Sequence, residues 1–249
     1  MRHWTIALCI LACLPGLGIS KTISPSLLPD SLPKEGRYRL VFVTSTTRDG
    51  LSSEVDEYND FVQSVADASD VTGPLGLEWK ALVSTETVDA RDNIEVNPLI
   101  YEITPIYLLD GRSATGRIPE TNELATSANL FAFDGRGARP IGLNITENAT
   151  ILPVNPPPFT DIGGAVVHTG TLGNGAASQF DALGGPPNRG RGGDAYLSGD
   201  GAYQWVSYDL TAPAHFYAVS EVFSVPEPSL GSATAIIAFG LVLVRRRHR

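Results

Sequence analysis

The sequence predicts an α+β domain with one main early helix, short antiparallel strands and long loops, which lies between two short hydrophobic terminal segments. Three observations favour this fold class. Residues 54–67 are strongly amphipathic, with the 3.6-residue period of a helix. Several short apolar runs, bounded by glycine, proline or aspartate, have the lengths of strands. Glycine recurs constantly over residues 163–201 with few apolar anchors, and this is typical of long loops around short strands.

The first half of the chain supplies most of the predicted strands. Residues 21–36 contain three prolines and are expected to form an extended lead-in to a domain over residues 37–224. The run Tyr38–Val43 is apolar except for one arginine, which predicts a buried strand. Trp79–Val83 is a second candidate, and Pro105–Leu109 is a third that should stop at the following Asp-Gly turn.

One main helix is predicted early in the domain. Its apolar positions recur at helical spacing and define one face: Val55, Tyr58, Val62, Val65 and Ala66. The opposite face is acidic and is expected to be solvated. Ser53 and Asp56 resemble a capping box, with Asp in the place of the usual Glu, and Gly73-Pro74 is expected to end the helix.

The remaining elements are shorter. Thr85–Asn93 could form a short helix, and residues 153–158, with four prolines, should form a stiff loop. Tyr203–Val206 is expected to begin a further ordered segment. His215–Val225 is rich in aromatic and β-branched residues, which predicts a strand that closes the domain.

The amino terminus has the layout of a secretory signal peptide over residues 1–20. A short basic start precedes an apolar stretch over residues 5–14, and Gly18-Ile19-Ser20 offers a small-x-small cleavage site. Cleavage is therefore expected between Ser20 and Lys21. A lipoprotein signal is an alternative, because Leu11-Ala12-Cys13 partly fits such a site.

The carboxyl terminus combines a proline motif, an apolar segment and a basic tail. Residues 230–244 contain no charge, and a helix of this length spans about 22 Å against a hydrocarbon core of about 30 Å. Such a short transmembrane helix can be accommodated by snorkelling arginines and local thinning. The positive-inside rule places the basic tail in the cytoplasm, and that tail consists of Arg245, Arg246, Arg247 and Arg249. A buried core helix is the alternative.

This ending resembles the PEP-CTERM sorting signal of Gram-negative bacteria. The motif residues are Val225, Pro226, Glu227 and Pro228, followed by the short span and the arginines. The resemblance implies export, an inner-membrane-anchored precursor, and processing near the motif by an exosortase-type protease. Members occur in species that make exopolysaccharide and biofilm. The protein is therefore expected at the cell surface or in the extracellular matrix.

The charge of the chain excludes one class of partner. Residues 21–229 hold all 27 acidic residues but only 13 of the 18 lysines and arginines, which gives a formal net charge of −14. Such a surface repels nucleic acid and anionic lipid, so DNA or RNA binding is not expected. Cations and neutral glycans remain compatible partners.

The sequence predicts no thiolate metal site. Both cysteines, Cys9 and Cys13, lie in the predicted signal peptide, so the mature protein would have neither a disulfide nor a thiolate site. We expect no cofactor. The candidates for a calcium site are Asp194 and Asp200, because calcium takes oxygen ligands.

The mature domain resembles an endostatin-type domain, a branch of the C-type-lectin-like fold. The residues that carry the resemblance are the strand candidates around 38–43, 79–84 and 105–107, the helix around Tyr58–Phe61, the segments at 130–135 and 168–170, and the closing run 216–220. The chain departs from that family because it lacks the disulfide cysteines, the amino-terminal zinc histidines and the basic heparin-binding surface. The resemblance therefore implies fold only.

Catalytic motifs are absent from the sequence. There is no complete G-x-S-x-G, P-loop, H-E-x-x-H or G-x-G-x-x-G pattern. Asp89 and Asp92 flank Arg91, but residues three apart on one helix share a face, so an ion pair or a cap is the better interpretation than a catalytic pair. Two hypotheses follow. The domain is a non-enzymatic binding module, with exopolysaccharide as a candidate ligand, or it is a secreted hydrolase acting on extracellular polymers.

Overall fold

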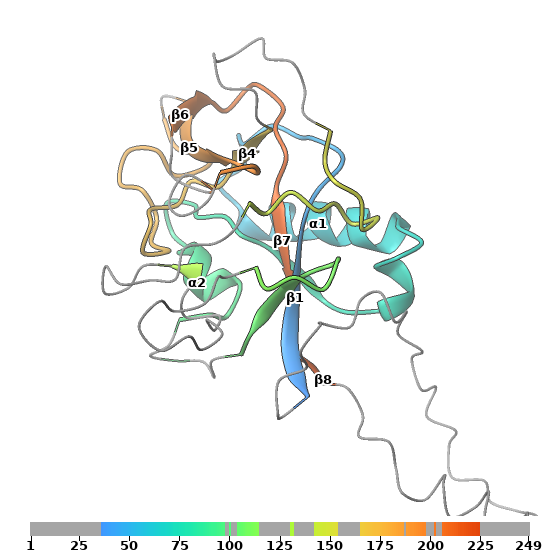
Figure 1. The fold of residues 1–249 in the computed structure, drawn as a ribbon. Coiled ribbons are helices and arrows are strands. Elements are labelled where there is room, and N and C mark those ends of the chain that lie inside the picture. The colour runs from blue at the N-terminus through green and yellow to red at the C-terminus, as the bar shows by residue number, and fades with distance from the viewer. Residues whose placement is uncertain are drawn as a thin grey trace, which may run out of the picture.

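The structure is a computed structural model that describes residues 36–97, 100, 104–114, 130–131, 142–153, 165–186, 188–197, 202 and 206–224. Within these ranges the fold is α+β, with one long helix, one short helix and two sheets, and this confirms the predicted fold class. Figure 1 shows the smaller sheet lying beyond one end of the long central strands.

The larger sheet is built around β1 (Arg37–Val43), the strand predicted from its apolar run. Its strand order is β2 (Trp79–Ala81), β7 (Tyr217–Ser220), β1 and β3 (Ile106–Leu108), and β8 (Phe223–Ser224) also pairs with β1. The described strand pairs are antiparallel except β1 with β3, which is parallel. The expectation of antiparallel strands was therefore wrong for β3.

Turns shorten the predicted strands of this sheet. The second strand ends at Ala81 rather than Val83, because the Val83 N–H turns back to the Ala81 carbonyl at 2.9 Å. The third strand stops as predicted at Asp110-Gly111, where Gly111 has a φ of 85° that favours glycine. The closing run divides into β7 and β8 instead of forming one strand.

Helix α1 (Val55–Ala68) packs against β2 and β7 through the predicted apolar face, with Tyr58, Val62 and Ala66 buried. The predicted capping box is absent. Glu54 is the N-cap residue, and it makes no side-chain capping bond. Ser53 lies one residue before this N-cap, and its hydroxyl donates to the Glu54 carboxylate at 3.2 Å. The helix ends at Ala68, ahead of a 3₁₀ turn, η2 (Gly73–Leu75).

Side-chain amides satisfy the outer edge of β2. The Asn59 Oδ1 accepts the Ala81 N–H at 2.8 Å, and the Asn93 Nδ2 donates to the Ala81 carbonyl at 2.7 Å. Gln63 Oε1 accepts the Trp79 N–H at 2.8 Å. Asn93 comes from helix α2 (Ala90–Asn93), which is the helical part of the stretch 85–93 that was predicted as a short helix. These bonds cover an edge that would otherwise expose unpaired backbone groups.

The smaller sheet has the order β4 (Val166–His168), β5 (Arg189–Asp194) and β6 (Val206–Asp209). Glycine occupies β5 because neighbouring groups lie close to its backbone. A Cβ added to Gly192 would lie 2.6 Å from the Val167 carbonyl oxygen and 2.7 Å from Tyr208 Cδ2. Glycine thus lets the Tyr208 ring lie against β5. This sheet adjoins the start of β7, because the His168 N–H donates to the His215 carbonyl at 2.9 Å.

The membrane prediction falls outside the described residues. Among the helices that the structure describes, none is long and apolar enough to cross a membrane. Residues 230–244, the predicted span, are not among them.

Candidate functional site

The sequence-predicted sorting residues all lie outside the described ranges. These residues are Ser20, Lys21, Val225, Pro226, Glu227, Pro228, Arg245, Arg246, Arg247 and Arg249. Asp200, the second calcium candidate, also lies outside these ranges. The sorting signal and the cleavage sites therefore remain predictions.

Asp194, the described calcium candidate, caps a turn. It lies at the end of β5, is 5% exposed, and its Oδ1 accepts the Tyr196 N–H at 2.9 Å. No group of three or more His, Cys, Asp or Glu side chains suited to a metal occurs among the described residues. The geometry gives Asp194 a structural role at this turn.

Asp89 and Arg91 form the ion pair that the sequence suggested. Arg91 donates to the Asp89 Oδ2 at 2.8 Å, and the Asp89 Oδ1 accepts the Ala177 N–H at 2.7 Å. Asp92 instead accepts a bond from Asn97 at 2.7 Å. The two carboxylates thus bind different partners, and Asp89 ties α2 to the loop around Ala177.

A cavity of about 100 Å³ with charged walls lies at the edge of the larger sheet. Its charged side chains bond to one another and to backbone carbonyls. Lys80 bonds to the Glu95 carboxylate at 2.8 Å, and this bond lowers the pKa of Glu95. Buried Arg39 donates to the carbonyls of Ile94 at 3.0 Å and Ser220 at 2.9 Å. These groups join β1 and β2 to the turn after α2, and we assign the cluster a structural role.

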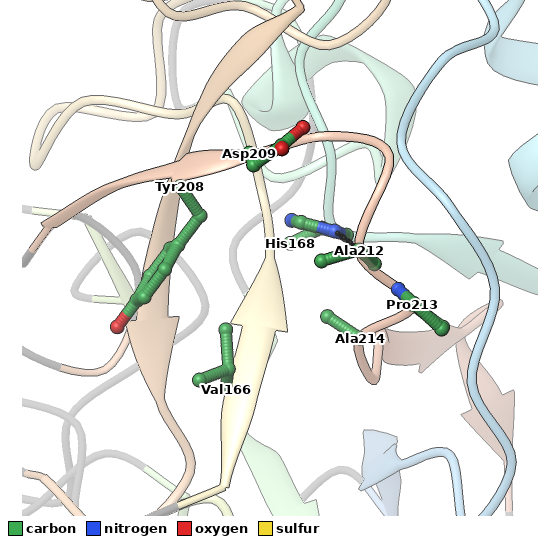
Figure 2. A pocket seen from close by; sticks show the side chains of 7 residues that line it. All are labelled: Val166, His168, Tyr208, Asp209, Ala212, Pro213 and Ala214. Atoms are coloured by element: carbon green, nitrogen blue, oxygen red, sulfur yellow. Dashed lines mark hydrogen bonds between the residues drawn. The ribbon is translucent and has the colours of Figure 1, made fainter. Parts of the chain in front are cut away.

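The best candidate for a binding site is a second cavity, of about 80 Å³, beside the smaller sheet. Figure 2 shows side chains of β4, β6 and the segment 212–214 around the same space, with Asp209 at its edge. Its lining residues are Val166, His168, Tyr208, Asp209, Ala212, Pro213 and Ala214. Five of these seven are Val, Ala, Pro or Tyr, so the wall is predominantly apolar.

A tight turn after β6 builds one side of this cavity. The Asp209 Oδ1 accepts both the Thr211 N–H at 2.9 Å and the Thr211 hydroxyl at 2.8 Å. The Ala212 N–H donates to the Asp209 carbonyl at 3.1 Å, which closes the turn. The chain is then fixed to the loop after β1, because Ala214 and Arg48 exchange backbone bonds at 2.9 and 3.1 Å. Local turn chemistry thus positions Asp209 and the three residues opposite it.

His168 joins that turn to β4. Its side chain is buried, and its Nε2 lies 2.9 Å from the Ala212 carbonyl, so Nε2 carries the proton and donates. Burial lowers the pKa of His168, which keeps the ring neutral at physiological pH. Within the part of the chain that the structure describes, Nδ1 is buried without a hydrogen-bond partner. His168 therefore forms a buried, uncharged part of the cavity wall.

Asp209 gives the mouth of the cavity its charge. Its carboxylate is exposed, and hydrogen bonds from Thr211 lower its pKa, so it is ionised at neutral pH. Tyr208 has its pKa raised by burial and stays neutral. The seven lining residues thus include one anion and no cation. The arrangement suits a ligand with an apolar part and a hydrogen-bond donor, and it disfavours an anionic ligand.

Sequence analysis did not identify this site. No predicted sequence motif includes Asp209, Tyr208 or Ala212, and His168 belongs only to a segment that carries the fold resemblance. The signal present was the spacing Asp209-x-Thr211, which is typical of an Asx turn. Nothing in the sequence showed that this turn would lie against β4, some 40 residues earlier in the chain.

Comparisons with known proteins add no assignment. No protein-family model matches this chain, and no curated protein matches it.

Proposed function

We propose that this chain is an exported bacterial protein of the cell surface or extracellular matrix, and that its domain binds extracellular polysaccharide without turning it over. The cavity between β4, β6 and the segment 212–214 is the observation that carries the binding role. It pairs apolar walls with one ionised acceptor, Asp209, and an aromatic side chain, Tyr208. Pockets with a few placed polar groups in an apolar wall are typical ligand sites.

The location rests on the two ends of the sequence. The signal-peptide pattern over residues 1–20 supports export, and the motif at 225–228, the apolar span and the arginines support PEP-CTERM sorting. The precursor would be anchored in the inner membrane, and an exosortase-type protease would be its processing partner. After processing, the domain would be released to the surface or the matrix.

The finer fold proposal is a C-type-lectin-like, endostatin-like arrangement. Its support is the combination of one main early helix, short strands and long connecting segments. The α+β class is compatible with this fold.

Binding is favoured over hydrolysis by the chemistry of the cavity wall. Glycoside hydrolysis generally uses two carboxylates placed across the scissile bond. One carboxylate, Asp209, lines this cavity. His168 is engaged through Nε2 with the Ala212 carbonyl, so it is positioned as a wall residue and not as an accessible base.

A glycan array run beside turnover assays on the same glycans tests the proposal. We expect the protein to retain one or more neutral glycans without releasing product, and to do so equally well in the presence of EDTA. Asp209→Asn should weaken retention. Asp70→Asn is the matched control, because Asp70 is also exposed but does not line the cavity. Product release from any retained glycan would favour the hydrolase, and no retention at all would refute the binding role.

A further inference from the structure

We propose that the cavity beside β4 and β6 takes the acetamido group of an N-acetylated amino sugar. This inference rests on the proposed polysaccharide-binding function and names the sugar that the site selects. The sugar ring itself would lie outside, over the mouth of the cavity.

The size of the cavity favours a substituent over a whole ring. Sites that enclose complete small-molecule ligands have volumes of roughly 300–1,000 Å³. This cavity measures about 80 Å³, which leaves room for only a few heavy atoms. A methyl group on a short linker fits that space, while a pyranose ring must remain at the surface.

The wall requires an apolar group. Val166, Ala212, Pro213 and Ala214 present only carbon side chains to the cavity, and His168 is neutral beside them. A hydroxyl or ammonium group placed against these carbon side chains would lose water without gaining a partner from them. A methyl group has no such cost, and its burial is favourable.

The mouth requires a hydrogen-bond donor. One oxygen of Asp209, Oδ1, is occupied by the N–H and hydroxyl of Thr211. The other oxygen belongs to an exposed, ionised carboxylate and can accept a further bond. An acetamido group offers an N–H two bonds from its methyl carbon, so one substituent meets both the wall and the mouth. The same carboxylate, with no cation in the lining, disfavours uronic acids and sulfated sugars.

Isothermal titration calorimetry of the mature secreted protein with three β-1,4-linked trisaccharides tests the inference. They are N,N′,N″-triacetylchitotriose, its fully deacetylated form and cellotriose, which differ only at carbon 2. We expect the acetylated trimer to bind about tenfold more tightly than either other trimer, since it alone provides both the methyl group and the amide N–H. Its affinity should depend little on salt.

Two variants test whether the preference for the acetylated trimer arises at this cavity. Ala214→Leu fills the space and should remove the preference for the acetylated trimer. Asp209→Asn should weaken the acetylated trimer selectively, because Asn can keep one oxygen for Thr211 while losing the charged acceptor. Circular dichroism confirms that each variant is folded. Asp70→Asn should bind like the parent.

Other outcomes overturn the inference in distinguishable ways. Tightest, salt-sensitive binding of the deacetylated trimer would mean that the site recognises charge. Equal affinity for cellotriose would mean that carbon 2 is not recognised. If none of the trimers binds while the array retains other glycans, the acetamido inference fails and the polysaccharide-binding function stands. If the array is also empty, both fail.

Discussion

Truncation of Trp79 should destabilise the domain far more than truncation of Phe180. Trp79 is 2% exposed, and its ring meets the Phe42 ring edge-on with the centroids 4.8 Å apart. Removing a buried aromatic side chain of this size costs about 3–5 kcal/mol through lost burial and the cavity left behind. Phe180 is 76% exposed, so its removal should change the free energy of unfolding by less than about 0.5 kcal/mol.

These energies convert to melting temperatures that are easy to separate. For a domain of this size each kcal/mol shifts the midpoint by about 2–4 °C, so Trp79→Ala should melt about 6–20 °C below the parent. Phe180→Ala should melt within about 2 °C of it. Differential scanning calorimetry of the purified variants measures both.

Equal stability of the Trp79→Ala variant and the parent would refute the packing of β2 against β1 and β7. Trp79 would then be exposed, and stacking on a sugar ring would become its more plausible role. If Trp79→Ala does not accumulate, Trp79→Phe gives a second test. It should retain part of the contact with Phe42 and melt between the parent and the alanine variant.

Three further predictions concern pH, redox state and processing. Burial lowers the pKa of His168 and His215, so below about pH 6.5 the unfolded state binds more protons than the folded state. The free energy of unfolding should therefore decrease as the pH decreases, by up to about 1.4 kcal/mol per pH unit for each histidine. Urea unfolding between about pH 5 and pH 7.5 measures this dependence; His168→Gln should reduce it, and a flat profile would contradict it. The melting temperature should not move with dithiothreitol, because residues 21–229 contain no cysteine; a drop of several degrees would argue against the predicted signal boundary. Changing residues 226–228 to alanine should leave Arg249 on the precursor, whereas mass spectrometry of the mature wild-type protein should find it removed; wild-type protein that keeps Arg249 would indicate a plain anchor.

The larger sheet and its helix were predictable because their patterns are local. The run Tyr38–Val43 is buried along its whole length, and the stripe of Tyr58, Val62 and Ala66 gives α1 its packed face. The N-terminus of α1 was mistaken because the helix begins at Val55, which makes Glu54 the N-cap and leaves the Ser53 hydroxyl bonded to the neighbouring Glu54 carboxylate. Capping motifs compete with such neighbours, and sequence alone does not decide between them.

The smaller sheet was only partly predictable because glycine carries little strand signal. β5 contains three glycines in six residues, a composition that predicts a loop. It is a strand because it pairs with β4 on one side and β6 on the other, and Gly192 permits this pairing because a Cβ there would clash with the Tyr208 ring and the Val167 carbonyl. This reason depends on neighbours distant in sequence. The candidate site shares that dependence, since it joins β4 to the turn after β6.

Titration of the ¹⁵N-labelled mature protein with fragments of the source organism's extracellular polysaccharide tests the binding role most directly. Amide chemical-shift changes report where a ligand contacts the protein. The proposed site predicts saturable changes centred on Tyr208, Asp209 and Ala212, with the polysaccharide intact after incubation. Changes centred elsewhere, no change at saturating concentration, or cleavage of the fragments would contradict it.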